Sequence, residues 1–363
     1  MRVLIAPDSF KGSISALLAA QAISSGWRSI RPDDEVVITP LADGGEGTME
    51  AIHHVRGGEY LQLTAIDPDN NDIDALWLLL SDGTAVVELA SASGLPLLES
   101  PAPLTAHTFG FGQLLRQACN DPRTKRIIAT VGGSASTDGG TGALAALGFT
   151  FLDVDGIPIG LGGEELLRLE SIDATAAISP PTGGVIVLTD VINELTGLNG
   201  AAYIFSPQKG ANSVDIKILN QALQRLAKVV GQDSDFPGAG AAGGTGFGLH
   251  ALWNATVTAG SEYVIDLMLL SKGVELADIV ITGEGSLDDQ SWGGKVIGAI
   301  SKLCQESGTP LIAIVGQDNR TKVEHKIEEV ITLHSVAPHG VDTQNNPAQW
   351  LAEAGKRAAQ KIV

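Results

Sequence analysis

The sequence predicts an α/β protein made of two α/β domains with largely parallel sheets. Short apolar runs recur along the chain, and helix-length amphipathic stretches lie between several of them. Residues 126–129 and 185–188 are apolar without polar alternation, as expected for parallel strands that are covered on both faces. The chain has 363 residues, and two domains are expected because single hydrophobic cores stop growing near about 250–300 residues.

The predicted elements alternate along much of the chain. Strands are predicted at residues 3–6, 36–39, 84–88, 126–131, 185–189, 279–282 and 311–315. Helices are predicted at residues 15–29, 47–56, 111–119, 214–230, 295–307 and 349–362. Residues 67–72 form a polar, turn-prone segment, the most linker-like part of the first third of the chain.

The amino-acid composition argues against several classes of binding partner. Hydrophobic residues make up 44% of the chain and charged residues 18%, as in a compact globular protein. The formal net charge of -19 would repel phosphates, so neither nucleic acid nor an anionic membrane is expected as a partner. Cys119 and Cys304 lack the spacing of a zinc site or a disulfide framework, and the longest apolar run, residues 75–80, is too short to span a bilayer. A cytoplasmic protein is expected, and a homodimer is left open.

Glycine-rich and acidic segments follow five of the predicted strands. They read APDSFKGS (residues 6–13), PLADGGEG (40–47), TVGGSASTDGG (130–140), LTDVIN (188–193) and ITGEGSLDDQ (281–290). In open parallel sheets, ligands bind beyond the carboxyl ends of the strands. The sequence therefore predicts a ligand site that is lined with carboxylates.

The segment at residues 132–140 links a predicted strand to a short helix at residues 143–147. Its glycines let the backbone approach a ligand closely, and N–H groups at the start of a helix favour negative charge. A phosphate or a carboxylate would fit there. An ordinary flexible βα turn is the alternative interpretation.

The segment at residues 281–295 also leads from a strand into a helix. Lys295 follows two glycines and is placed to contact a phosphate, while Glu284 and Asp288 are suited to hold Mg²⁺. The segment is not a Walker A motif, because it lacks the first glycine of that pattern, and an exposed turn is the alternative. Residues 238–243 have the spacing of a dinucleotide fingerprint but no strand before them, so we interpret them as a loop packed close to a ligand or another backbone.

The first two strand exits combine carboxylates with a cation. Asp8, Ser9 and Lys11 follow the first strand, and Asp43 and Glu46 follow the second. Phosphoryl transfer needs carboxylates for Mg²⁺, cations that neutralise charge, and a group that orients the attacking hydroxyl. For any single aspartate, capping of the following helix is the alternative role.

Asp190 ends the strand predicted at residues 185–189, and Asn193 follows within one turn. An acidic residue beside an amide at a strand end indicates either a metal ligand or the base that accepts a hydroxyl proton, and we favour the base. The chain has no G-x-S-x-G elbow, so an acyl hydrolase has little support.

These segments, in this order, resemble the motifs of the bacterial type I glycerate kinase family. The matching stretches are APDSFKGS, LADGGEGT, GGSASTDGGTGALAALG, TDVIN, SPQKGA, PGAGAAGG and ITGEGSLDDQ with GGK. The resemblance implies ATP-dependent phosphorylation of D-glycerate, usually at the 2-hydroxyl to give 2-phosphoglycerate, with the active site in an interdomain cleft. It also implies that residues 1–65 plus 280–363 form a discontinuous flavodoxin- or Rossmann-like domain, into which residues 66–279 are inserted as a second α/β domain.

The positions that match the family pattern define the expected site. Catalytic roles are expected for Asp190, Lys295, Lys11 and Asp8, with Asp190 orienting the glycerate hydroxyl. Substrate or phosphate binding is expected at Ser9, Gly44, Gly45, Gly132, Gly133, Ser134, Asp138, Lys209, Gly283 and Gln290. The expected cofactors are ATP and Mg²⁺, with the metal at Asp43, Glu284 and Asp288.

Three residues differ from the usual family pattern, and a proline that is common after the Gly-Lys step is missing between Val296 and Ile297. Thr137 stands where Asn is usual, Glu194 where Pro commonly follows Asn193, and Ser286 where a basic residue is frequent. Loss of a cation beside Glu284 would weaken a phosphate or carboxylate contact. Two alternatives therefore stay open, a kinase for another small hydroxy acid and a non-catalytic sensor that binds glycerate or nucleotide.

Overall fold

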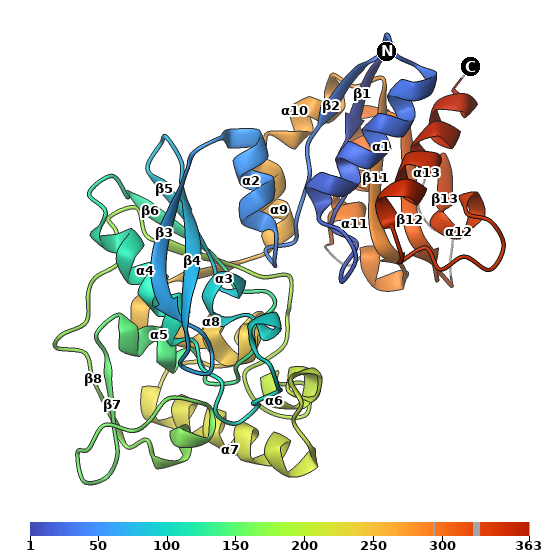
Figure 1. The fold of residues 1–363 in the computed structure, drawn as a ribbon. Helices are drawn as coiled ribbons and strands as arrows, with labels where there is room; N and C mark the ends of the chain where they lie inside the picture. Colours follow the sequence, from blue (N-terminus) through green and yellow to red (C-terminus); the bar gives the residue numbers. More distant parts are fainter. Residues whose placement is uncertain (293–294, 322–326, 363) are drawn as a thin grey trace. The chain divides into compact units, whose positions relative to one another are not determined.

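The computed structural model describes residues 1–292, 295–321 and 327–362, and the chain divides into two compact units. Unit 1 consists of Met1–Asp43, Glu50–Arg56 and Gly260–Val363, and unit 2 consists of Gly44–Met49 and Gly57–Ala259. Each unit combines helices with a largely parallel sheet, which confirms the predicted α/β class (Figure 1). Among the described residues, no helix is both long enough and apolar enough to cross a membrane.

Unit 1 is built on a five-stranded parallel sheet in the order β13-β12-β11-β1-β2. The strands are β1 (Arg2–Ile5), β2 (Glu35–Ile38), β11 (Ile279–Leu287), β12 (Leu311–Asp318) and β13 (Glu329–Thr332). The chain passes from β1 to β2 on one side and continues with β11 on the other side of β1. This is the flavodoxin-like order, and it opens a crevice at the carboxyl ends of β1 and β11, where the direction of winding reverses.

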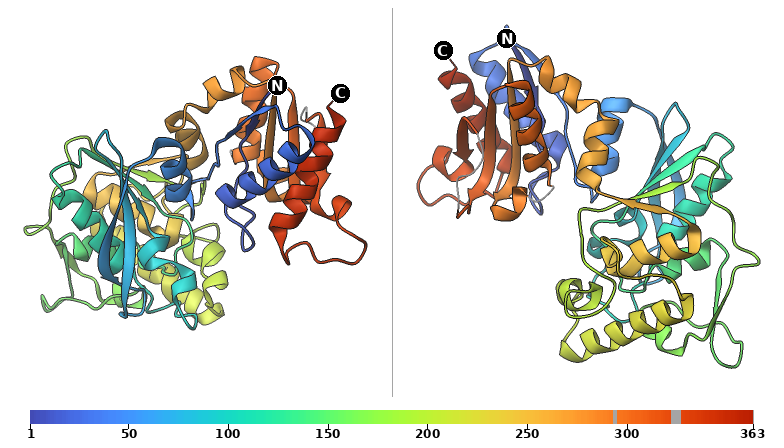
Figure 2. Two further views of the ribbon diagram at one scale, coloured as in Figure 1. Left: turned by 45° about the horizontal axis from the view of Figure 1, so that its top comes forward. Right: turned by 180° about the vertical axis from the view of Figure 1, so that it is seen from behind.

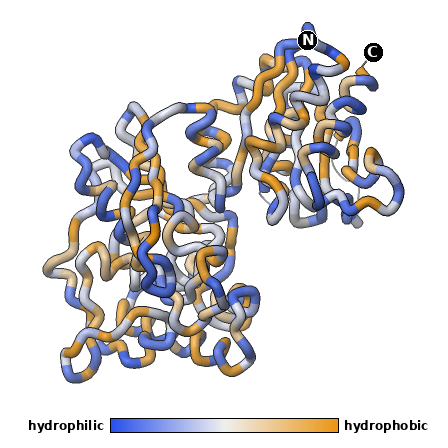
Figure 3. The backbone as a smooth tube through the Cα atoms, in the orientation of Figure 1, coloured by the Kyte–Doolittle hydropathy of each residue, from blue (hydrophilic) through white to orange (hydrophobic). Residues whose placement is uncertain are grey.

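Helices cover both faces of this sheet. The helices α1 (Ala16–Ile30) and α13 (Pro347–Lys361) pack side by side on one face and share a core with Ile5 and Ile281 (Figure 2). On the other face, Ile297 of α11 (Val296–Ser307) packs with Ala313. The central strands are orange in Figure 3, as their burial requires. The other helical elements of this unit are α9 (Gly260–Leu267), α10 (Leu270–Glu275), η4 (Asp289–Trp292) and α12 (Leu333–Val336), and α2 (Thr48–Arg56) is divided between the units.

Unit 2 is built on a six-stranded sheet in the order β10-β9-β6-β5-β4-β3. The strands β5 (Thr84–Glu88), β6 (Arg126–Thr130), β9 (Val185–Leu188) and β10 (Thr256–Thr258) are parallel. The strands β3 (Glu59–Ile66) and β4 (Asp72–Leu79) join them antiparallel, and β7 (Thr150–Leu152) and β8 (Ser171–Asp173) form a separate pair. The helices are α3 (Ala90–Ser93), α4 (Phe109–Asn120), α5 (Thr141–Ala146), α6 (Ala201–Phe205), α7 (Ser213–Val230) and α8 (Ala241–Trp253), with the 3₁₀ turns η1 (Leu95–Leu97), η2 (Glu164–Arg168) and η3 (Pro207–Lys209).

All of the predicted strands and long helices occur, close to their predicted limits. The turn expected at residues 67–72 is confirmed, but the linker interpretation is wrong, because this turn connects β3 and β4 in a hairpin. The carboxylate of Asp67 accepts hydrogen bonds from the backbone N–H groups of Asp69 (2.7 Å) and Asn71 (2.9 Å), which is the usual way in which aspartate closes a turn. The hairpin was missed because β3 is a half-exposed edge strand without a continuous apolar run.

The limits of the two units also differ from the predicted domain limits after residue 65 and before residue 280. Strand β3 pairs with β4 along its whole length and therefore belongs to unit 2. Helices α9 and α10 pack against α11 and therefore belong to unit 1.

Close contact between α1 and α13 depends on two glycines. A Cβ atom on Gly26 would lie 1.9 Å from the carbonyl oxygen of Ala352, and one on Gly355 would lie 2.3 Å from that of Ile23. Both distances are far below van der Waals contact. The packing of the helix pair on the sheet of unit 1 therefore requires glycine at both positions.

The variant Gly26→Ala is expected to lower the free energy of unfolding by about 1–3 kcal/mol, because the methyl group forces α1 and α13 apart. The matched control is Gly273→Ala in α10, where the new Cβ would approach Leu4 Cδ2 only to 3.5 Å. The control is expected to stabilise the protein by up to about 1 kcal/mol through helix propensity alone. Urea unfolding of both variants measures the two effects, and changes of the same sign would contradict the packing argument.

Candidate active site

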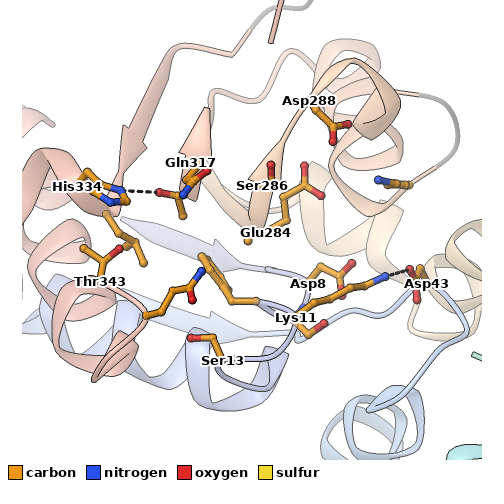
Figure 4. A pocket seen from close by; sticks show the side chains of 17 residues that line it. Asp8, Lys11, Ser13, Asp43, Glu284, Ser286, Asp288, Gln317, His334 and Thr343 are labelled. Carbon is orange, nitrogen blue, oxygen red and sulfur yellow. Dashed lines mark hydrogen bonds and ion pairs between the residues drawn. The ribbon is translucent and has the colours of Figure 1, made fainter. Parts of the chain in front are cut away.

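A cavity of about 330 Å³ lies in unit 1 at the carboxyl ends of β1, β11 and β12, beside the switch point of the sheet (Figure 4). Residues from the exits of three predicted strands line it together. They are Asp8, Ser9, Lys11, Asp43, Glu284, Asp288 and Lys295. Sequence motifs that lie far apart along the chain thus meet in one cavity of one unit.

Asp8 is fixed in this cavity by the backbone that follows β1. Its N–H donates to the carbonyl oxygen of Gly283 at 2.8 Å, which continues the β1–β11 pairing by one step. The side chain is buried, and its Oδ1 accepts a hydrogen bond from the Ser9 N–H at 2.6 Å. Burial raises the pKa of Asp8 to about 7, and the negative charge of Asp43 adds to that rise. The carboxyl group of Asp8 therefore changes its charge near neutral pH.

Glu284, on β11, is the second buried acid of the cavity. It is 8% exposed, and its Oε1 has no hydrogen-bond partner in the described part of the chain. Burial raises its pKa, while a hydrogen bond from Ser291 and the charge of Lys295 oppose the rise. An acceptor that is buried and unpaired costs free energy unless a ligand satisfies it. The structure thus provides an oxygen atom suited to a cation or a donor group.

Lys11 reaches the same region from the loop after β1. Its Nζ pairs with Asp43 Oδ2 at 3.2 Å, and the side chain is 77% exposed. The charge of Asp43 raises the pKa of Lys11, so this lysine stays protonated. An exposed pair of this kind adds little to stability, which leaves the ammonium group available for an anionic ligand.

The three predicted metal ligands line this cavity, but they are not arranged as a ready-made site. Within residues 1–292, 295–321 and 327–362, no three His, Cys, Asp or Glu side chains form a group that could hold a metal ion. Mg²⁺ usually takes only one or two protein carboxylates and completes its shell with water and substrate phosphates. The unpaired Glu284 Oε1 and the nearby Asp43 and Asp288 fit that pattern.

In unit 2, Lys209 braces the glycine-rich loop after β6. It is 2% exposed, and its Nζ donates to Ser134 Oγ at 2.8 Å and to the carbonyl oxygen of Ser136. Burial lowers the pKa of Lys209 to about 7, although the charge of Asp138 opposes the shift. The hydrogen bonds of Lys209 therefore hold the loop itself. The predicted anion contacts in this loop are Gly132, Gly133 and Ser134.

Asp138 holds the same loop from its other side. Its wholly buried carboxylate accepts hydrogen bonds from Ser136 Oγ and from both the N–H and the Oγ1 of Thr108. The N–H groups of Gly140 and Gly142 add two more. These five donors occupy the lone pairs of the carboxylate, so Asp138 stabilises the loop from within the protein. Its predicted contact with substrate stays a prediction.

Glu88, at the end of β5, is a positioning residue that sequence reasoning missed. Its Oε1 accepts from the Gly47 N–H at 2.8 Å and its Oε2 from the Met49 N–H at 3.1 Å, where α2 begins. The predicted contact residues Gly44 and Gly45 lie two to three residues before the first of these donors. Gly45 packs closely on Gly132, because a Cβ atom on Gly132 would lie 2.4 Å from the Gly45 Cα. An acidic residue that ends a uniformly buried strand was the available signal.

Residues 238–243 pack close to other backbone segments, which is one of the two alternatives that the sequence left open for them. A Cβ atom on Gly243 would lie 2.3 Å from the carbonyl oxygen of Ser136, and one on Gly240 would lie 2.2 Å from that of Glu194. Ala242, Gly243 and Gly244 are all left-handed, which is costly for alanine. Gly243 places this strained turn directly against the backbone of the loop.

The other predicted site residues are distributed between the units. Asp190 follows β9 in unit 2 and is half-buried. Gly283 packs on β12 in unit 1, and a Cβ atom on Gly283 would lie 2.2 Å from the carbonyl oxygen of Ile314. The side chain of Gln290 lies outside the described residues. Ser286 Oγ accepts from Asn319 Nδ2 at 3.0 Å, so a neutral amide contacts the position where a basic residue is frequent.

Phe10, Ser13, Gly285 and Ser286 also line the cavity, and they belong to the segments that were predicted to form a ligand site. Sequence reasoning missed the part of the cavity formed by β12 and the segments after it. Its lining residues are Gly316, Gln317, Leu333, His334, Thr343 and Gln344. The exit of the strand predicted at residues 311–315 was the one signal for Gly316 and Gln317, since ligands collect at strand exits.

Comparison with known proteins gives consistent matches along the chain. The sequence pattern of the glycerate kinase family matches residues 3–363. The chain is 39% identical to a glycerate kinase of Haemophilus influenzae, over 92% of this chain and 91% of that protein. It is 40% identical to a glycerate 2-kinase of Escherichia coli, over 92% and 90%. A crystal structure described as glycerate kinase 2 of Salmonella typhimurium is 36% identical and superimposes with a TM-score of 0.84 over 100% of this chain and 98% of the other.

The variant Asp8→Asn is expected to change how stability depends on pH. The pKa of Asp8 is about 7 in the folded state and near 3.8 when unfolded, so the folded state binds the proton more tightly between these values. Stability contributed by this group therefore falls as pH rises through that window. Asparagine cannot ionise, which removes this fall. The stability of the variant relative to the parent should therefore increase from pH 5.5 to pH 8, and its profile of unfolding free energy against pH should be flatter between about 4 and 7.

Urea unfolding without Mg²⁺, at several pH values, measures this difference. The exposed Asp33→Asn is the control, because Asp33 does not line the cavity. Parallel pH profiles for the parent and Asp8→Asn would contradict the raised pKa.

Proposed function

The chain belongs to the glycerate kinase family, and from this premise we propose that it transfers the γ-phosphoryl group of ATP to the 2-hydroxyl of D-glycerate. The observation that carries the proposal is the cavity at the switch point of unit 1, which gathers buried carboxylates and two lysines from three strand exits. Phosphoryl transfer needs this combination of groups. The name of the Escherichia coli relative, glycerate 2-kinase, supports the 2-hydroxyl as acceptor and 2-phosphoglycerate as product.

In this proposal, the phosphates of ATP occupy the charged part of the cavity. Lys295 stands before the first turn of α11, and Lys11 lies on the loop after β1, so both can contact phosphate oxygens. Mg²⁺, held by Glu284 with Asp43 or Asp288, would supply positive charge where the transferred group gathers negative charge. Without such charge, the carboxylates of the cavity would repel a polyphosphate.

The acceptor is assigned to residues of unit 2. The glycerate hydroxyl oxygen forms a bond to the γ-phosphorus, the bond from that phosphorus to the bridging oxygen breaks, and ADP leaves with the electron pair. Asp190 accepts the hydroxyl proton, as a half-buried carboxylate at a strand end can do. The loop at residues 132–140, held by Lys209 and Asp138, offers N–H and hydroxyl donors to the glycerate carboxylate.

We assign the reaction to the cytosol and its partners to small molecules, glycerate and ATP. The net charge of -19 supports the absence of a nucleic-acid partner, because it would repel a phosphate backbone. Both cysteines are free thiols, which suits a reducing compartment.

Coupled ADP release with MgATP and D-glycerate tests the proposal, with phosphorus NMR to identify the product. Turnover should depend on D-glycerate and should exceed the rates with L-glycerate, glycerol or no acceptor. Asp190→Asn should lower kcat by about 10²–10⁴-fold, because a general base typically contributes that much. Asp235→Asn, an exposed aspartate of the same unit, should leave kcat unchanged.

Turnover no higher than that without acceptor would reject the kinase. Thermal stabilisation by glycerate or nucleotide without ADP release would then favour the sensor. Turnover with another hydroxy acid alone would favour the broader kinase alternative.

A further inference from the structure

The cavity of unit 1 has two chemically different ends. Asp8, Lys11 and Asp43 lie at one end, and Gln317, His334 and Thr343 lie at the other (Figure 4). The first end carries formal charges of both signs. The second end is lined by amide, hydroxyl, imidazole and apolar groups, and none of the described lysines or arginines lines it.

The neutral end has an apolar surface and a polar edge. Leu333, at the start of α12, is almost fully buried and lines the cavity. Gln317, at the end of β12, and Thr343 and Gln344, before α13, add carboxamide and hydroxyl groups. A flat ring with polar atoms along one side is the kind of ligand that such a surface recognises.

The two ends are joined by glycines. Gly285 of β11 and Gly316 of β12 both line the cavity, and a Cβ on Gly316 would lie 2.3 Å from the Gly285 carbonyl oxygen. Neither residue places a side chain in the space between the ends. A single elongated ligand can therefore extend from one end to the other.

We infer that the neutral end is the base subsite of the nucleotide and takes adenine, while the charged end takes the phosphates. This inference rests on the proposed ATP-dependent function. A carboxamide offers a donor and an acceptor side by side, which matches the N6 and N7 atoms of adenine. Gln317 and Gln344 supply carboxamides, and no cationic lysine or arginine is present among the described lining residues there.

The size of the cavity favours a nucleotide over the small acid. A volume of about 330 Å³ lies in the range of small-molecule sites, and glycerate alone would fill only a part of it. The buried Glu284 Oε1, which lacks a hydrogen-bond partner among the described residues, marks the charged end as a site built for a ligand.

Paired probes with and without a base test the inference. Calorimetry on the full chain compares the affinities for MgADP and for magnesium tripolyphosphate, in the absence of glycerate. Gln344→Ala should weaken MgADP binding by about fivefold to twentyfold, because it removes one polar contact to the base. Tripolyphosphate binding should change by less than twofold, since this probe has no base.

A second variant and a matched control complete the design. Thr343→Val keeps the shape of the side chain but removes its hydroxyl. This variant should also weaken the binding of MgADP and leave the binding of tripolyphosphate unchanged. Gln21→Ala replaces an exposed glutamine of α1 that does not line the cavity, and it should change neither affinity. MgGDP should bind the parent less tightly than MgADP.

Several results would overturn the base subsite. Unchanged MgADP affinity in both Gln344→Ala and Thr343→Val would place the base elsewhere, and so would equal losses for both probes. Glycerate-dependent turnover together with unchanged affinities would reject the subsite and keep the kinase. A selective loss of MgADP affinity without turnover in the parent would keep the subsite and reject the kinase.

Discussion

The burial of two carboxylates, one on β11 and one just after the neighbouring β1, is the constraint on which the proposed function of unit 1 depends. Asp8 and Glu284 stand where the sheet reverses its direction of winding, and the Asp8 N–H is tied to the β11 backbone. Burial disfavours the charged forms and raises both pKa values. The free protein therefore keeps a destabilising arrangement, and such arrangements are typical of functional sites. In the proposed function, a bound cation would relieve it.

Unit 2 differs from unit 1, because its charged side chains support the glycine-rich loop at residues 132–140. In the proposed function, this loop has to be held in place while its N–H and hydroxyl donors stay available. Lys209 and Asp138 hold the loop from within, and Glu88 holds the neighbouring segment at the start of α2. These charged groups are satisfied by the protein itself. They act by positioning the loop, in the way that supporting residues orient the groups that contact a ligand.

The sequence predicted the parallel strands and the residues that follow them, because apolar runs and strand exits are local signals. It could not predict that Asp138 and Lys209 turn inward, since their partners Thr108 and Ser134 are distant in sequence. The hairpin at Asp67 was hidden by a half-exposed edge strand. The neutral end of the cavity, with Gln317, was hidden because only the three-dimensional fold brings its uncharged residues together.

The most direct test of this account is the affinity of the parent protein for ADP, measured by calorimetry with Mg²⁺ and again with EDTA. Carboxylates outnumber lysines in the cavity, so the polyphosphate needs the metal ion to offset repulsion. The account predicts that binding is at least about tenfold tighter with Mg²⁺. Equal or tighter binding in EDTA would contradict it.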